Sequence, residues 1–231
     1  KACDLASGPY APNTVMTILG SGLAWSTQAL TSADIAGGRL PTTLNGTQVF
    51  VGGWPAPIFF VSDNQVNFLM PSNQIAGTVK VWVVRQSLAG PQVQLTLVDE
   101  APALFPSPIA SGYAIAQHWP DYSVISPALP AGPGGVVILY ATGLGKTDFD
   151  PALPDEIPLY PGSIERMQDL SVYLDGKPMD PAEVLYAGLA PGWAGLYQID
   201  LVLPDDAGPD PEIRVAIGAQ VSAPGLKLAV Q

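Results

Sequence analysis

Acidic side chains gather at two places in the sequence and are the first candidates for chemistry. The stretch at 148–156 contains Asp148, Asp150, Asp155 and Glu156, and a second group lies at 205–210. Carboxylate oxygens are the ligands that Ca²⁺ prefers, so the first stretch predicts a calcium site. Its spacing differs from that of an EF-hand loop, however, and Pro151 and Pro154 indicate an exposed loop. We therefore favour the alternative, in which these solvated charges keep an apolar chain in solution.

Tryptophan residues in expected turns are the second group of candidates. An exposed indole ring provides a flat apolar face on which a sugar ring can stack. We accordingly predict a ligand-binding role for Trp25, Trp54, Trp119 and Trp193. The alternative, that these rings cap the ends of the folded units, stays open. Trp82, in an alternating segment, is expected to be a packed strand residue.

Nucleophilic and nucleotide chemistry have weak support. His118 is the one histidine, and Asp121 and Ser123 follow it, but the sequence has no G-x-S-x-G turn that would expose a reactive serine. The segment GLGKT at 143–147 lacks the earlier glycine of a phosphate-binding loop, because Tyr140 occupies that position. One Cys and one His cannot build a zinc cage or an iron–sulfur site. We predict no catalytic residue, and a hydrolase with an unrecognised site remains the alternative.

The composition indicates the kind of scaffold that must hold these residues. The 231 residues include 24 Gly and 25 Pro, which would interrupt helices, while 48% hydrophobic residues are too many for a disordered chain. Many short strands joined by tight turns fit both facts. A net charge of −11 repels phosphate backbones and anionic membrane surfaces. We expect no nucleic-acid partner and no membrane span.

Four sequence blocks recur in one order and indicate an internal duplication. VMTILGSGLA from Val15 matches VVILYATGLG from Val136, and QVFVGGWPAP from Gln48 matches SVYLDGKPMD from Ser171. QVNFLMP and VQLTLV, at 65–71 and 93–98, match QIDLVLP and LKLAVQ, at 198–204 and 226–231. The offset grows from 121 to 133 residues. Insertions are therefore expected in the acidic stretch 148–169 and at 187–196.

Apolar residues alternate with polar ones inside these blocks, as half-buried strands require. Val66 and Phe68 are expected to face a core, with Asn67 and Leu69 on the opposite face. The predicted fold class is all-β, with two tandem immunoglobulin-like β-sandwich domains related by internal duplication. We place the first domain at residues 1–101, a proline-rich linker at 102–112 and the second domain at 113–231.

The same blocks carry a resemblance to a known family. APGWAGLYQIDLVLP at 190–204, together with ILYATGLG and VGGWPAPIFFVSDNQVNFLMP, resembles the Solibacter uncharacterised C-terminal domain. The unit is also similar in architecture to immunoglobulin-like folds of the IPT/TIG type. The resemblance to the Solibacter domain implies a module at the end of a large exported bacterial protein, and it brings no catalytic residue with it.

These observations together predict a non-catalytic extracellular module that serves as a spacer, anchor or display domain of a larger bacterial protein. The expected location is the cell surface or the medium. The expected partners are proteins or carbohydrates at that surface, and we expect no cofactor, with calcium as the open alternative. A carbohydrate- or surface-ligand-binding module that uses the loop tryptophans is the competing hypothesis.

Overall fold

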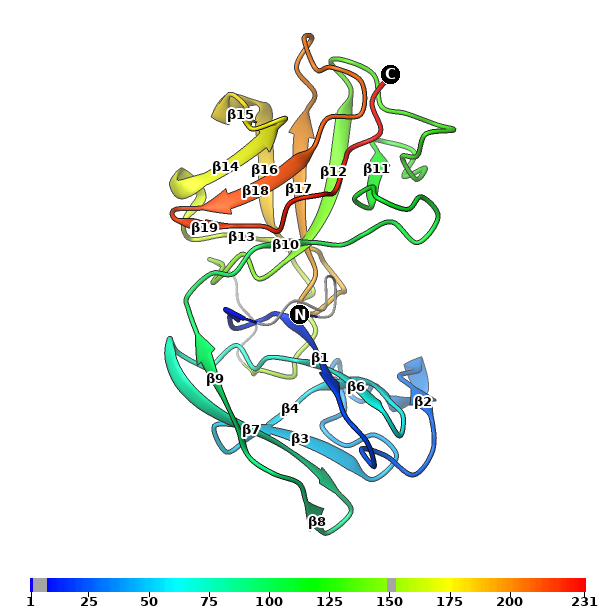
Figure 1. Ribbon diagram of the computed structural model, residues 1–231, viewed down its shortest axis with the longest axis vertical. Coiled ribbons are helices and arrows are strands. Elements are labelled where there is room, and N and C mark those ends of the chain that lie inside the picture. The colour runs from blue at the N-terminus through cyan, green and yellow to red at the C-terminus, as the bar shows by residue number, and fades with distance from the viewer. Residues whose placement is uncertain (2–7, 149–152) are drawn as a thin grey trace.

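The computed structural model describes residues 1, 8–148 and 153–231. It consists of two β-sandwiches stacked along the long axis of the molecule (Figure 1). The start of the chain lies between the two sandwiches, and the C-terminus lies at the far end of the second. This all-β arrangement confirms the predicted fold class. No helix in the described ranges is long and apolar enough to cross a membrane.

The first sandwich contains a sheet with the strand order β1-β6-β5-β2 and a sheet with the order β4-β3-β7-β8, in which β9 also pairs with β7. All of these pairs are antiparallel. The strands are β1 (Val15–Leu19), β2 (Gln28–Ala29), β3 (Thr47–Val51), β4 (Trp54–Ala56), β5 (Ile58–Val61), β6 (Gln65–Leu69), β7 (Gly77–Arg85), β8 (Leu88–Ala89) and β9 (Val93–Leu97).

The second sandwich repeats this plan and adds strands to it. One sheet has the order β10-β12-β17-β16-β13, with β11 also paired to β12, and the other has the order β15-β14-β18-β19. The strands are β10 (Ala103–Leu104), β11 (Ala116–His118), β12 (Val136–Thr142), β13 (Gly162–Ser163), β14 (Leu170–Leu174), β15 (Lys177–Pro178), β16 (Val184–Leu189), β17 (Tyr197–Val202), β18 (Ile213–Ile217) and β19 (Gln220–Val221). Three single 3₁₀ turns complete the described elements: η1 (Ser32–Asp34), η2 (Met167–Asp169) and η3 (Pro181–Glu183).

The strand registers support the predicted duplication residue by residue. Val15 of β1 lies opposite Leu69 of β6, and Val136 of β12 lies opposite Val202 of β17. The first residues of the two pairs differ by 121 positions and the second by 133, which are the offsets of the repeated blocks. The hairpins β3–β4 and β14–β15 correspond in the same way. A slip of one residue in the register would turn every side chain to the other face of the sheet. Because the registers are equal, corresponding residues of the two copies face the core or the solvent in the same way.

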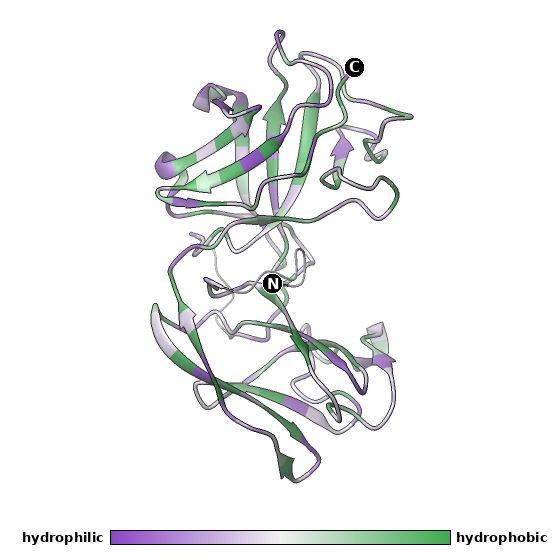
Figure 2. Cartoon of the chain, viewed as in Figure 1, coloured by the Kyte–Doolittle hydropathy of each residue, from purple (hydrophilic) through white to green (hydrophobic). Residues whose placement is uncertain are grey.

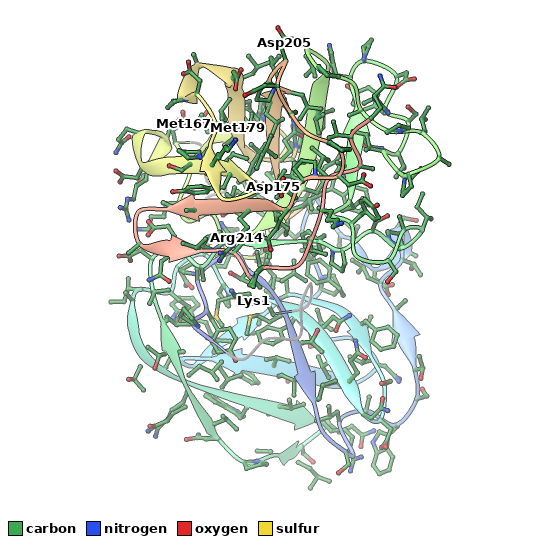
Figure 3. All side chains as sticks on the ribbon, turned by 45° about the horizontal axis from the view of Figure 1, so that its top comes forward. Lys1, Met167, Asp175, Met179, Asp205 and Arg214 are labelled. Atoms are coloured by element: carbon green, nitrogen blue, oxygen red, sulfur yellow. The ribbon has the colours of Figure 1, made fainter. Side chains whose placement is uncertain are left out.

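Each sandwich has its own hydrophobic core between its two sheets. Val49 and Val51 of β3 and Phe68 of β6 are fully buried in the first core. In the second, Met179 and the partly buried Met167 cover one side of the core (Figure 3). Hydrophobic colour alternates with hydrophilic colour along several strands, as a buried inner face and a wet outer face require (Figure 2).

Two details of the chain between the cores differ from the simplest prediction. Leu69 was expected on the polar face of its strand, and this is wrong: its side chain is 1% exposed, because that face of β6 ends against the second sandwich. The segment predicted as a linker, 102–112, contains β10, which pairs with β12. Leu104 of β10 is buried in the second core. The domain boundaries themselves stay a prediction.

Candidate functional site

The four candidate tryptophans are all exposed but belong to four different places in the fold, three connections and the start of a strand. Trp25 follows β1, Trp54 begins β4, Trp119 follows β11, and Trp193 lies between β16 and β17. Their exposed fractions run from 54% to 67%. Among the described residues, the ring pairs in contact are Phe50 with Trp82 and Trp119 with Tyr122, so none of the four stacks on another. They do not form one shared platform, and their role in binding stays a prediction.

The end of the acidic stretch, at Asp155 and Glu156, lies where the two sandwiches meet. Asp155 accepts hydrogen bonds from the Nε and Nη2 atoms of Arg39, at 3.0 and 2.6 Å. Asp150 lies outside the described residues. Within the described ones, no group of three or more His, Cys, Asp or Glu side chains gathers as a metal site would need. The calcium hypothesis therefore gains no support from Asp148, Asp155 or Glu156.

Residues 155–157, at the end of this stretch, instead connect the two sandwiches. The N–H of Leu40 donates to the carbonyl oxygen of Asp155 at 2.7 Å, and the N–H of Ile157 donates to that of Gly38 at 2.9 Å. Residues 38–40 of the first sandwich and 155–157 of the second thus pair like two short antiparallel strands, and the Arg39–Asp155 ion pair lies beside them. We call this contact the clamp. The insertion that the repeat predicted as a loop joins the two copies.

A second group of contacts, which we call the seam, joins the ends of β1 and β12. The buried hydroxyl of Thr142 accepts a hydrogen bond from the N–H of Val15 at 3.2 Å and donates to the carbonyl oxygen of Gly195 at 2.9 Å. The N–H of Ala101 donates to the carbonyl oxygen of Gly143 at 2.8 Å. A buried polar group that loses such partners costs stability. The seam therefore fixes the angle between the sandwiches.

Glycine is required at the seam because the chains approach closely. Gly143 and Gly195 have φ values of +74° and +75°, which L-residues rarely adopt. A Cβ at Gly143 would collide with the carbonyl oxygen of Ala101, and one at Gly195 would collide with Leu69. Gly143 is also the first glycine of the GLGKT segment, which follows β12 without entering a helix. Residues 143–146 have no regular secondary structure and Thr147 forms a bridge with Ile164, so the segment lacks the helix that follows a phosphate-binding loop.

A buried carboxylate completes the seam. Glu100 is 7% exposed, and its Oε2 atom lies 2.7 Å from Nη1 of Arg166, which also contacts Asp169. Burial raises the pKa of Glu100, and the positive charge of Arg166 opposes that rise. The ion pair with Arg166 therefore offsets part of the free-energy cost of burying the charged carboxylate of Glu100 at the seam.

His118 is not part of a catalytic relay in the structure. Its Nε2 atom lies 3.3 Å from the carbonyl oxygen of Leu129. The hydroxyl of Ser123 donates to Asp121 at 3.0 Å instead of to the imidazole. Hydrogen bonds from the backbone and hydroxyl of Ser123 lower the pKa of Asp121. These three residues form a turn, and serine-type chemistry gains no support from them.

Corresponding polar pairs lie on β6 and β17. Gln65 donates to Asn67 at 2.9 Å, and at the matching positions Gln198 donates to Asp200 at 3.3 Å. Burial raises the pKa of Asp200 because the sheet face around it excludes water. The same cause raises the pKa of Tyr186 to about 12. The duplication has kept the pair but placed an ionisable carboxyl group in only one copy.

The sequence interpretation missed a groove in the first sandwich. It has a volume of about 710 Å³ and lies between β1 on one side and β7, β8 and β9 on the other. Ile18, Val83 and Leu95 line it, and Leu19 and Leu88 at its rim are 63% and 61% exposed. Arg85 also lines it; its guanidinium carbon lies 3.8 Å from the ring centre of Trp25, and its Nε atom is buried without a hydrogen-bond partner.

Comparison with known proteins agrees with the fold of the first sandwich. Residues 4–97 match the family model of the IPT/TIG domain. This match supports an immunoglobulin-like fold family. It covers less than half of the chain, and the resemblance to the Solibacter family stays a prediction. No curated protein matches the chain.

Several solved structures show distant likeness. The mixed-linkage glucan utilization locus protein SGBP-B of Bacteroides ovatus, in complex with a heptasaccharide, is 13% identical, with a TM-score of 0.28 over 99% of this chain and 45% of that one. The extracellular region of plexin A4 is 13% identical, with a TM-score of 0.29 over 97% of this chain and 17% of that one. Domains 5–6 of the S-layer protein SbsC are 10% identical, with a TM-score of 0.25 over 98% and 94%. The chain thus spans less than half of the first two, and scores this low add nothing to the argument.

Proposed function

We propose that the chain is a non-catalytic module that spaces, anchors or displays a larger bacterial protein outside the cell. The observation that carries this proposal is the clamp together with the seam, which hold two sandwiches at one angle. A spacer must keep its length under thermal motion, and sandwiches joined only by a flexible linker would not. The low cysteine count and the family resemblance support the location.

Small-angle X-ray scattering of the chain tests the rigid spacer. One fixed arrangement of the two sandwiches is expected to fit the wild-type curve. The double variant Arg39→Ala with Thr142→Val removes the ion pair to Asp155 from the clamp and both hydroxyl hydrogen bonds of Thr142 from the seam. It is expected to increase the maximum dimension of the molecule and to need several arrangements to fit its scattering curve. Arg214→Ala is the matched control, since Arg214 donates to the carbonyl oxygen of Ser222 inside the second sandwich. A wild-type curve that needs many arrangements would overturn the proposal.

Location and lack of catalysis have their own tests. An external protease added to intact cells that make the parent protein is expected to remove this module, whereas a cytosolic marker stays intact. A fluorophosphonate probe for serine hydrolases is expected to leave the chain unlabelled. Labelling that His118→Ala abolishes would favour the hydrolase alternative.

Carbohydrate binding is the second candidate, and the exposure of the four candidate indole rings is what favours it. A glycan array tests it directly, with Trp25→Ala, Trp54→Ala, Trp119→Ala and Trp193→Ala as separate variants. Because the four rings lie at different places in the fold, we expect a real site to depend on one of them. Binding that none of the four variants weakens would exclude these tryptophans as the platform.

A further inference from the structure

The carboxyl group of Asp200 on β17 is half-buried and forms no ion pair with the residues that the structure describes. Its side chain lies on the face of the sheet that points away from the core, because Ile199 and Leu201 beside it in the strand are fully buried in that core. Both carboxylate oxygens lie 3.3 Å from the Nε2 atom of Gln198. The residues outside the described ranges include no Lys or Arg. The negative charge of Asp200 is therefore uncompensated.

The first copy shows that the fold does not need a carboxyl group at this position. Asn67 occupies the matching place on β6 and accepts hydrogen bonds from the hydroxyl of Thr17 at 3.0 Å and from the amide of Gln65 at 2.9 Å. In the second copy, Ile138 corresponds to Thr17 and has no group that could donate. Burying a charge without such partners costs stability. Residues that break a local rule in this way are expected at functional sites.

Asp200 lies at the centre of a polar and aromatic surface. Ile138 of β12 and Tyr186 of β16 are directly opposite Asp200, and Tyr140 of β12 is opposite Gln198. Opposite residues of antiparallel strands share one face of the sheet. β11, β12, β17 and β16 are successive neighbours (Figure 1) and together span about 14 Å. We call the outer face the surface made of Gln117, Ile138, Tyr140, Tyr186, Gln198 and Asp200.

The two tyrosines of the outer face are held in fixed orientations. The hydroxyl of Tyr186 donates to a backbone carbonyl oxygen of its own strand at 2.9 Å, and a Cβ at Gly188 would collide with its ring, so the ring lies over Gly188. The hydroxyl of Tyr140 donates to Gln117. Burial raises the pKa of both hydroxyl groups, and the negative charge of Asp200 adds to the rise. Side chains that are already ordered lose little entropy when a ligand binds.

Trp119 continues this surface beyond the edge of the sheet. The amide of Gln117 donates to the carbonyl oxygen of Tyr122 at 2.8 Å. The rings of Tyr122 and Trp119 meet edge to face, with their centres 5.5 Å apart. Both rings are about half exposed, at 52% and 54%. The outer face thus joins one of the four candidate tryptophans to a carboxylate, an amide and two ordered phenol rings.

The chemistry of the outer face restricts what can bind there. Aromatic rings stack on the apolar C–H faces of a ligand, while a carboxylate accepts hydrogen bonds from its hydroxyl groups. A sugar chain offers both along its length. An acidic sugar would be repelled by Asp200 and by the net charge of −11. A single amino group would use the carboxylate alone and leave the row of rings unoccupied.

We propose that the outer face of the second sandwich is a binding site for a neutral oligosaccharide. Hydroxyl groups of the sugar chain form hydrogen bonds with Asp200 and Gln198, and sugar rings stack on Tyr186 and Trp119. This inference rests on the second candidate function, carbohydrate binding, and gives that function a site. The first sandwich is not expected to share it, because Asn67 is already bonded to its neighbours.

A glycan array with neutral, acidic and amino glycans, probed with the full chain, selects the ligand, and calorimetric titration of the strongest neutral glycan tests the site. Asp200→Asn is expected to weaken binding about tenfold, because it removes a charge-assisted hydrogen bond. The same variant is expected to melt at a higher temperature at pH 7, since it removes a buried charge. A purely structural role for Asp200 would not give weaker binding in a more stable protein. Asp206→Asn, at an exposed position between β17 and β18, is the control for the change in charge.

Trp119→Ala tests the aromatic part of the site. It is expected to weaken binding of the same glycan about tenfold, through the loss of one stacking contact. Trp54→Ala is the matched control, because Trp54 is 56% exposed and lies in the first sandwich. Melting curves of both variants confirm that they fold.

Three outcomes would overturn the site, and they differ in what else they exclude. If a neutral glycan binds and only Trp25→Ala, Trp54→Ala or Trp193→Ala weakens it, carbohydrate binding stands but belongs to another surface. If amino glycans are preferred and Asp200→Asn abolishes their binding, the carboxylate binds a cation instead. If no glycan binds, carbohydrate binding is excluded together with the site, while the spacer function is unaffected.

Discussion

The two sandwiches have the same strand plan and the same registers but differ at one edge. In the described part of the chain, β12 pairs with β10 and β11 as well as with β17, whereas β1 pairs with β6 and borders a groove. Strand registers depend on the inward and outward alternation that both copies inherited. Edge covering depends on residues outside the repeated blocks. Duplication thus preserved the interior of the unit, and the described contacts of the two copies differ at this edge.

The largest expected effect comes from equivalent core positions. Leu139→Ala is expected to destabilise the chain by about 2–5 kcal/mol, since it empties a fully buried site. Ile18→Ala, at the matching position, should cost clearly less, because that side chain already borders the open groove. Urea denaturation of both variants measures the two costs. Equal losses would mean that the groove is closed in solution.

The seam offers the next largest effect. Gly143→Val introduces a side chain at positive φ and against the carbonyl oxygen of Ala101. We expect a loss of about 2–4 kcal/mol and a change in the scattering curve, because the angle between the sandwiches must change. Gly176→Ala is a suitable control, since its φ is also positive but the space around it is open. A Gly143→Val protein with the wild-type curve would contradict the role given to the seam.

Two buried threonines near the seam, Thr142 and Thr14, are expected to respond differently to replacement by valine in their effect on stability. Thr142→Val leaves two backbone groups without their hydroxyl partner and is expected to cost about 1–3 kcal/mol. Thr14 is as buried, but its Oγ1 atom has no hydrogen-bond partner. Thr14→Val should therefore be neutral or slightly stabilising. Calorimetric melting of the two variants distinguishes them, and a large loss for Thr14→Val would reveal a partner for its hydroxyl.

The smallest expected effect is a dependence on pH confined to the second copy. The pKa of Asp200 is raised in the folded chain, so its charged form is less favourable there than in the unfolded chain. Its contribution to stability is present below the unfolded pKa and is lost as the pH rises through the folded pKa. Asp200→Asn should stabilise the chain at pH 7 and have no effect at pH 3. Asn67→Asp in the first copy is expected to introduce a similar loss at pH 7, and urea denaturation at both pH values measures each.

Part of this protein could be predicted from its sequence because the signals are local. Alternation in segments such as 65–69 and 47–51 requires one wet and one buried face, and the repeated blocks carry that plan from one copy to the other. The exposed positions of Trp25, Trp119 and Trp193 also agree with connections at the surface, whereas Trp54, predicted in a turn, is exposed but lies in strand β4. These inferences need only neighbouring residues.

The tertiary structure alone decided which residues meet across long stretches of sequence. The acidic neighbours of Asp155 in the sequence predicted that it would bind a metal, but its partner in the structure is Arg39, which lies 116 residues away in the chain. Leu69 lies on the polar side of an alternating strand and is buried because the second sandwich covers it. The pairing of β11 with β12 likewise joins segments that no alternation pattern connects. Contacts of this kind depend on how two folded units approach each other, and no local pattern records that approach.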